Sequence, residues 1–62
     1  MPVITIEMHK TDNELKAKLI QKLTETAQEV TSLPAQTFTI LIHELDNANI
    51  GIAGKPRSEL LR

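Results

Sequence analysis

Two apolar runs with a period of two enclose a long amphipathic segment, and this order leaves the chain few folds. From Pro2 to Met8 alternate side chains share one face, and Thr37–Leu45 is a β-branched run with apolar residues on both faces. A strand, a crossover helix and a second strand form a β-α-β unit with parallel strands and a right-handed connection. We therefore predict an α+β fold in one domain, residues 1–62, with two parallel strands and one helix.

The segment between the runs carries helix signals at both ends. Thr11 and Glu14 have the spacing of a capping box, so we expect the helix to begin there. Pro34 should end it. Apolar residues recur at spacings of three and four, which predicts one stripe facing the sheet: Leu15, Leu19, Ile20, Leu23, Ala27 and Val30.

The pattern of the C-terminal part predicts a turn followed by a short hairpin or edge element. Asp46–Asn49 is typical of a turn, and Ile50–Gly54 predicts a small hairpin or edge element before a mobile basic tail. A phosphate-binding loop needs four residues between its glycines and a Ser or Thr after the lysine, whereas here two residues intervene and Pro56 follows. The flanking helices of a nucleic-acid GXXG clamp are also missing from the pattern. We expect these glycines to serve backbone turns.

The chain is too short to bury a large core, although 40% of its 62 residues are hydrophobic. Domains of this size usually need disulfides, a metal or a partner, and cysteine is absent here. One face of a two-stranded sheet lacks a helix and can pack against the same face of a second subunit. We therefore expect a homo-oligomer.

Charge and hydropathy exclude several classes of partner. Seven basic and eight acidic residues give a net charge of −1 without a block of like charge, which argues against nucleic acid. We see neither an apolar stretch of about 20 residues nor an export signal, so we expect no membrane partner and a cytoplasmic protein. His9 and His43 lack ligand spacing, so no structural zinc is predicted. His43 and Glu44 should point to opposite faces and form no acid/base pair.

Pro2 is the residue with the most distinctive possible chemistry. Its small ring permits removal of Met1, which would make its nitrogen a free secondary amine able to carry protons between carbons; an amide to a retained Met1 has no such basicity. A proline at position two is also common at uneventful N-termini. Lys10 is of interest because it lies just past the strand that begins at Pro2, and the alternative is that it is one more surface lysine.

Taken together, Pro2, the strand through Met8, Lys10-Thr11-Asp12, Pro34, the Phe38–Glu44 strand and Ile50–Gly54 resemble the 4-oxalocrotonate tautomerase family over nearly the whole chain. The resemblance implies β-α-β subunits that pair into dimers, three of which form a hexamer with shared active sites. It also implies that Pro2 is the catalytic general base, acting on a small-molecule enol or 2-oxo acid without cofactor or metal.

Three substrate-binding positions depart from the family pattern. Lys10 stands where members typically have arginine, Thr39 where a neighbouring subunit supplies a second arginine, and Ile50 where an aromatic residue forms a wall of the site. Losing one preorganised donor to a developing oxyanion commonly costs about 10²- to 10³-fold in turnover. We therefore expect poor activity on dicarboxylate substrates unless another cation takes over, the candidates being a partner chain or Lys55, Arg57 or Arg62 of another subunit.

Three functions follow as alternatives. The first is a tautomerase or isomerase with altered substrate choice, in which Pro2 is the general base and Lys10 is an anion anchor. The second uses the Pro2 nitrogen as a nucleophile towards a carbonyl compound or an unsaturated acid. The third is a non-catalytic or hetero-oligomeric subunit that keeps the scaffold with a decayed site.

Overall fold

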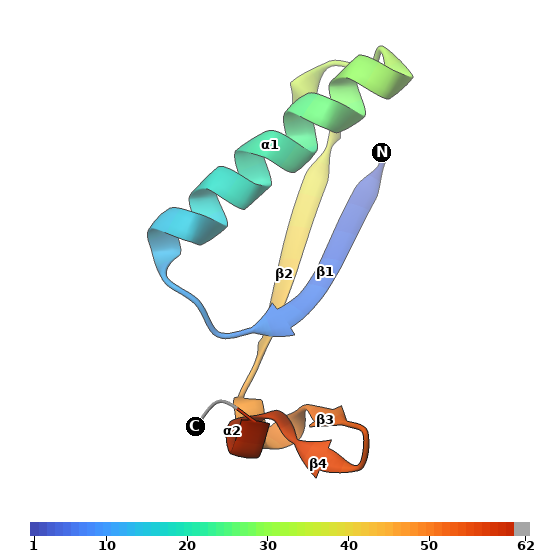
Figure 1. The fold of residues 1–62 in the computed structure, drawn as a ribbon. Coiled ribbons are helices and arrows are strands. Elements are labelled where there is room, and N and C mark those ends of the chain that lie inside the picture. The colour runs from blue at the N-terminus through green and yellow to red at the C-terminus, as the bar shows by residue number, and fades with distance from the viewer. Residues whose placement is uncertain (61–62) are drawn as a thin grey trace.

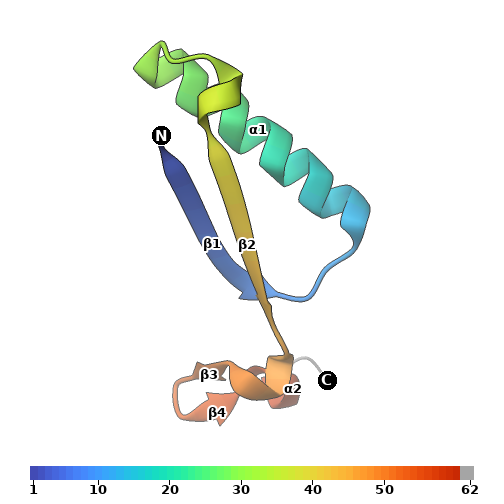
Figure 2. The same cartoon turned by 180° about the vertical axis from the view of Figure 1, so that it is seen from behind.

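The computed structural model describes residues 1–60 and confirms the β-α-β order (Figure 1). Strand β1 is Val3–His9, helix α1 is Asn13–Thr31 and strand β2 is Thr39–Leu45. The two strands are parallel, and α1 runs beside β2 when the molecule is seen from the front and from behind (Figures 1 and 2). Their register runs from Val3 opposite Thr39 to His9 opposite Leu45.

The two faces of this sheet have different surroundings. On the face towards α1, Glu44 accepts a hydrogen bond from Lys16 of the helix. Side chains alternate between the two faces of a strand, so the apolar residues at even-numbered positions share this face, and they are half-buried: Ile4, Ile6, Met8, Ile40 and Ile42. On the other face, Val3 and Leu41 are 51% and 44% exposed. The predicted uncovered sheet face is therefore present in the single chain.

Helix α1 begins one residue later than the capping box implied. The N-cap is Asp12, whose Oδ1 accepts a hydrogen bond from the N–H of Leu15 at 2.7 Å. The predicted Thr11 cap is wrong because the Thr11 N–H instead donates to Glu44 Oε2 at 3.0 Å. The helix ends as expected before Pro34, with Ser32 in the left-handed conformation (φ 62°).

The apolar stripe of α1 is wider than the sheet it covers. Leu19, Leu23 and Ala27 are half-buried, whereas Leu15, Ile20 and Val30 are 47%, 40% and 80% exposed. One chain therefore covers only part of the predicted stripe. Two strands about 4.8 Å apart are too narrow to cover every apolar position of a helix that extends beyond their ends.

The C-terminal segment is more ordered than expected. After the 3₁₀ turn Asn47–Asn49, strands β3 (Gly51–Ile52) and β4 (Lys55–Pro56) form an antiparallel hairpin, and Arg57–Leu60 forms the short helix α2. The two residues at the hairpin tip, Ala53 and Gly54, have φ values of 52° and 83°, as a type I′ turn requires. The predicted hairpin is confirmed, and the expected mobile tail begins as a helical turn.

The second strand also starts later than predicted. Ala35–Thr37 forms a 3₁₀ turn rather than the start of a strand, because both the N–H and the hydroxyl of Thr37 bond the carbonyl oxygen of Pro34, at 3.1 and 2.7 Å. The strand can begin only after this turn has closed.

The single chain is extended and has no fully buried side chain among residues 1–60. Its accessible surface is 4815 Å², about 800 Å² more than a compact monomer of 6.9 kDa exposes. Its radius of gyration is 14.7 Å, against about 10.6 Å for a compact domain of this length. Neither helix in the described part of the chain is long and apolar enough to cross a membrane.

Candidate functional site

Pro2 and Thr39 are neighbours at the amino end of the sheet. The Pro2 carbonyl oxygen accepts a hydrogen bond at 3.0 Å from the N–H of Thr39, which is the first paired residue of β2. Pro2 is half-buried, while Met1 is 90% exposed and its sulfur accepts a weak hydrogen bond from the Thr39 hydroxyl at 3.9 Å. Sheet register thus holds Pro2 in place and leaves the chain end in solvent.

Lys10 and Ile50 lie at the opposite end of the sheet. Lys10 directly follows β1, and Ile50 follows β2 and the 3₁₀ turn, at the hairpin end of the molecule in Figure 1. Lys10 lies eight residue steps beyond Pro2 along extended chain, which is about 26 Å. One chain therefore brings together Pro2 with Thr39 but does not bring Lys10 or Ile50 to them. A site that contains all four residues needs at least two copies of the chain.

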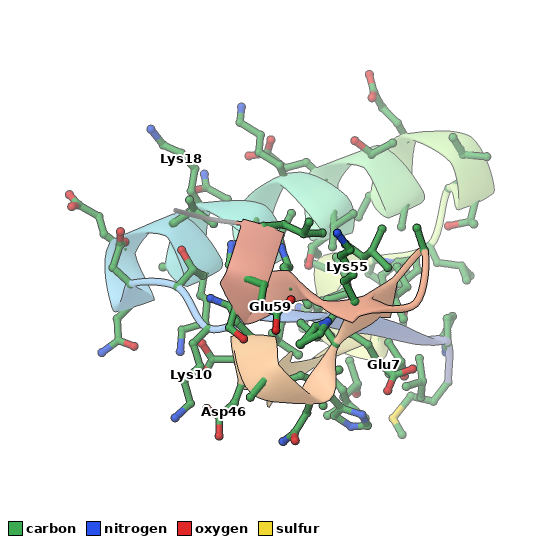
Figure 3. The ribbon with its side chains drawn as sticks, turned by 60° about the horizontal axis from the view of Figure 1, so that its bottom comes forward. Glu7, Lys10, Lys18, Asp46, Lys55 and Glu59 are labelled. Carbon is green, nitrogen blue, oxygen red and sulfur yellow. The ribbon has the colours of Figure 1, made fainter. Side chains whose placement is uncertain are left out.

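Lys10 is already engaged by an acidic side chain. Its Nζ lies 3.0 Å from Asp46 Oδ1, and the two side chains are 70% and 61% exposed. The hydrogen bond to Asp46 and the charge of Asp46 raise the pKa of Lys10, and the charge of Glu44 adds to this. Lys10 is therefore a protonated cation at neutral pH with a partner of its own (Figure 3).

A second charged cluster ties the loop before α1 to the end of β2. Glu44 accepts hydrogen bonds from Lys16 Nζ at 2.9 Å and from the Thr11 N–H at 3.0 Å. These two hydrogen bonds hold the pKa of Glu44 below its ordinary value, and the bond from Lys16 has the larger effect. The sequence analysis did not predict this cluster. The available signal was Lys16, which follows Leu15 and so lies next to the apolar stripe of α1.

Arg57 has a fixed position beside Ile50. Its N–H donates to the carbonyl oxygen of Ile50 at 2.7 Å, and its Nη1 donates to Asn47 Oδ1, also at 2.7 Å. Arg57 was one of the cations predicted to replace a missing arginine. Of the others, Lys55 is exposed on β4, and Arg62 lies outside the described residues.

Two grooves lie away from these residues. Grooves of about 350 and 270 Å³ run along α1, lined by Asp12, Glu14, Leu15, Lys18, Leu19 and Lys22. Neither groove is lined by a predicted site residue. Within residues 1–60 no three His, Asp or Glu side chains are grouped so that they could hold a metal ion.

The chain is similar to known tautomerases over nearly its whole length. Residues 2–59 match the family described as Tautomerase enzyme. The 2-hydroxymuconate tautomerase of Bacillus subtilis (strain 168) is 32% identical over 62 residues, which cover 97% of this chain and 98% of that protein.

Solved structures agree with this match. An apo crystal structure of an unfused 4-OT is 32% identical with a TM-score of 0.88, covering 95% of this chain and 98% of that one. The crystal structure of DmpI from Archaeoglobus fulgidus is 33% identical with a TM-score of 0.85, covering 92% and 98%. The predicted tautomerase-like fold is therefore confirmed, and this chain belongs to the tautomerase family.

Proposed function

We propose that this chain is an isomerase that moves a proton within enol or unsaturated 2-oxo acid substrates, with Pro2, freed of Met1, as the general base. One observation carries the proposal: the family match begins at Pro2 and extends to residue 59. Membership of the tautomerase family, together with similarity to a protein named as a tautomerase, supports isomerase activity in general. The role of Pro2 and the choice of substrate are the finer parts of the proposal.

The chemistry needs a Pro2 amine that is neutral near pH 7. Its lone pair takes a proton from the enol oxygen or from a carbon of the substrate, and the resulting ammonium returns the proton to a different carbon, so no atom is gained or lost. Removal from water and a nearby positive charge both lower the pKa of an amine. Ile50 from a second copy would exclude water, and Lys10 would supply positive charge and bind the substrate carboxylate.

An oligomer is part of the same proposal. The surface excess of about 800 Å² is similar in size to the area that each partner buries in a standard protein interface. The separation of Pro2 from Lys10 and Ile50 also requires a second copy for a complete site. We propose a homo-oligomer in which the uncovered sheet face is buried, and a hexamer built from three dimers as its full form.

The test begins with the intact mass of the purified protein, which should lack one methionine residue. Ketonisation of enolised phenylpyruvate is then measured for the wild type and for Pro2→Ala. General acid–base catalysis contributes about 10²- to 10⁴-fold, and the primary amine left by alanine retains part of it, so a loss of at least about tenfold is expected. Equal rates for the two proteins, or no catalysis by the wild type, would refute the proposed function.

A second candidate is a non-catalytic or hetero-oligomeric subunit. It is favoured by the neighbour of Pro2, because Thr39 is uncharged and its hydroxyl donates only a weak hydrogen bond, to the sulfur of Met1 at 3.9 Å. Purification from the native source distinguishes the two. A companion chain that co-purifies and restores activity to a mixture supports this candidate, whereas full activity of the chain alone excludes it.

A further inference from the structure

We propose that Asp46 is a specificity-determining residue that acts as a built-in counter-ion for Lys10, so that the site prefers substrates with one carboxylate to substrates with two. The inference rests on the proposed function in one respect, namely that Lys10 binds the substrate carboxylate. It goes beyond that function by naming the charge class of the substrate and the residue that sets it.

The pairing of Lys10 with Asp46 follows from the register of the sheet. His9 and Leu45 are the last paired residues of β1 and β2, so the residues that follow them leave the sheet side by side. The carbonyl oxygen of Asp46 also accepts a hydrogen bond from the Asn49 N–H at 2.8 Å, which fixes the backbone at this point. The ion pair is therefore built into the fold. Figure 3 shows both side chains projecting from the same edge of the molecule.

The charges around Lys10 cancel almost completely. Lys10 is balanced by Asp46 at 3.0 Å, and Lys16 is balanced by Glu44 at 2.9 Å. Thr39 brings no charge to the Pro2 end. A substrate carboxylate that binds Lys10 must displace Asp46 or share Lys10 with it. Lys10 then balances only one of these two negative charges, so a second substrate carboxylate would meet the other one unbalanced. A single carboxylate faces a smaller repulsion.

The size of the effect of Asp46 on anion binding follows from the solvent exposure of Lys10 and Asp46. Both side chains are well exposed, so water and salt screen their attraction, and a substrate carboxylate can displace Asp46. Removing the carboxylate from Asp46 should therefore strengthen anion binding by up to about fivefold per substrate carboxylate near Lys10. The effect should shrink as ionic strength rises.

A matched pair of non-reacting acids tests the inference directly. Crotonate and fumarate share a four-carbon unsaturated skeleton but carry one and two carboxylates. Their dissociation constants are measured by NMR titration for wild type, Asp46→Asn, Asp46→Glu and the control Glu29→Gln, which makes the same charge change on α1. We expect Asp46→Asn to tighten fumarate binding by more than crotonate binding, Asp46→Glu to stay near wild type, and Glu29→Gln to change neither.

The same variants are then compared in the enol assay with a monocarboxylate and a dicarboxylate enol. Asp46→Asn should lower KM for the dicarboxylate with little change in kcat. An unchanged fumarate-to-crotonate ratio in Asp46→Asn, an equal change in Glu29→Gln, or no binding of either acid overturns the inference. A shifted ratio in a protein without isomerase activity supports the charge preference while the proposed function fails, so the two outcomes are distinguishable.

Discussion

Folding of this chain should be coupled to its association. A single copy exposes about 800 Å² more than a compact monomer and buries no side chain fully among the described residues. If the native state is an oligomer, each tenfold dilution lowers the free energy of unfolding per subunit by about 0.7 kcal/mol for a dimer and about 1.1 kcal/mol for a hexamer. For a domain of this size that is about 3 to 9 °C in Tm.

The perturbation that tests this most sharply is Leu41→Lys on the uncovered sheet face. Leu41 is 44% exposed in one chain, and its complete burial in an interface would contribute part of the roughly 1.5 to 3 kcal/mol associated with burying a leucine. Lysine loses this contribution and introduces a charge that must leave water. Gln21→Lys is the matched control, because it adds the same charge at an exposed position of α1, where the Gln21 side chain donates a hydrogen bond to Glu25.

The assay combines light scattering after size exclusion with thermal unfolding by circular dichroism over a hundredfold range of concentration. We expect Tm of the wild type and of Gln21→Lys to rise with concentration, and Leu41→Lys to show a lower mass and a lower Tm. A Tm that does not depend on concentration, with a monomeric mass for the wild type, would refute the reasoning from surface area.

Three further predictions concern single residues. Asp12→Ala removes the N-cap bond to Leu15 and should lower the free energy of unfolding by about 1 kcal/mol, or Tm by about 4 to 8 °C at fixed concentration. Asp12→Asn should lose much less, because asparagine is also a good N-cap residue. Equal losses in the two variants would contradict the assignment of the cap. Because the pKa of Glu44 is lowered in the folded state, the ionised Glu44 side chain stabilises the fold above the ordinary pKa of 4.5. This stabilisation is lost as the pH falls through the lowered pKa. The urea midpoint of Glu44→Gln should therefore fall less steeply in acid than the midpoints of the wild type and of Glu29→Gln. Thr39→Arg should raise kcat/KM for a dicarboxylate enol by about tenfold or more if a missing cation limits the site, and an unchanged value would show that the position does not face substrate.

Local patterns in the sequence were sufficient for most of the fold. The period-two runs, the stop signal at Pro34 and the glycine of the hairpin turn each act over a few residues, and the structure confirms the elements they predict. The helix start was misjudged for a non-local reason. Thr11 has the right side chain for a cap, but its N–H bonds Glu44, which is 33 residues away, and Asp12 takes its place.

The candidate site was less accessible to sequence reasoning. Pro2, Lys10, Thr39 and Ile50 were named from a family resemblance, and their roles remain predictions. Nothing in the local pattern indicated that Asp46 would pair with Lys10, or that Asn47 would hold Arg57 beside Ile50. Both contacts depend on how β2 ends and how the following turn folds back.

The sequence by itself determined the order of strand, helix, strand and hairpin, because hydrophobic period, caps and turn residues act locally. Only the tertiary structure decided which of the chemical groups meet. The parallel register brings Pro2 to Thr39 and Lys10 to Asp46, and the length of β1 keeps these two pairs about 26 Å apart. A strand is stiff over that length, so one copy of the chain cannot complete the proposed site alone.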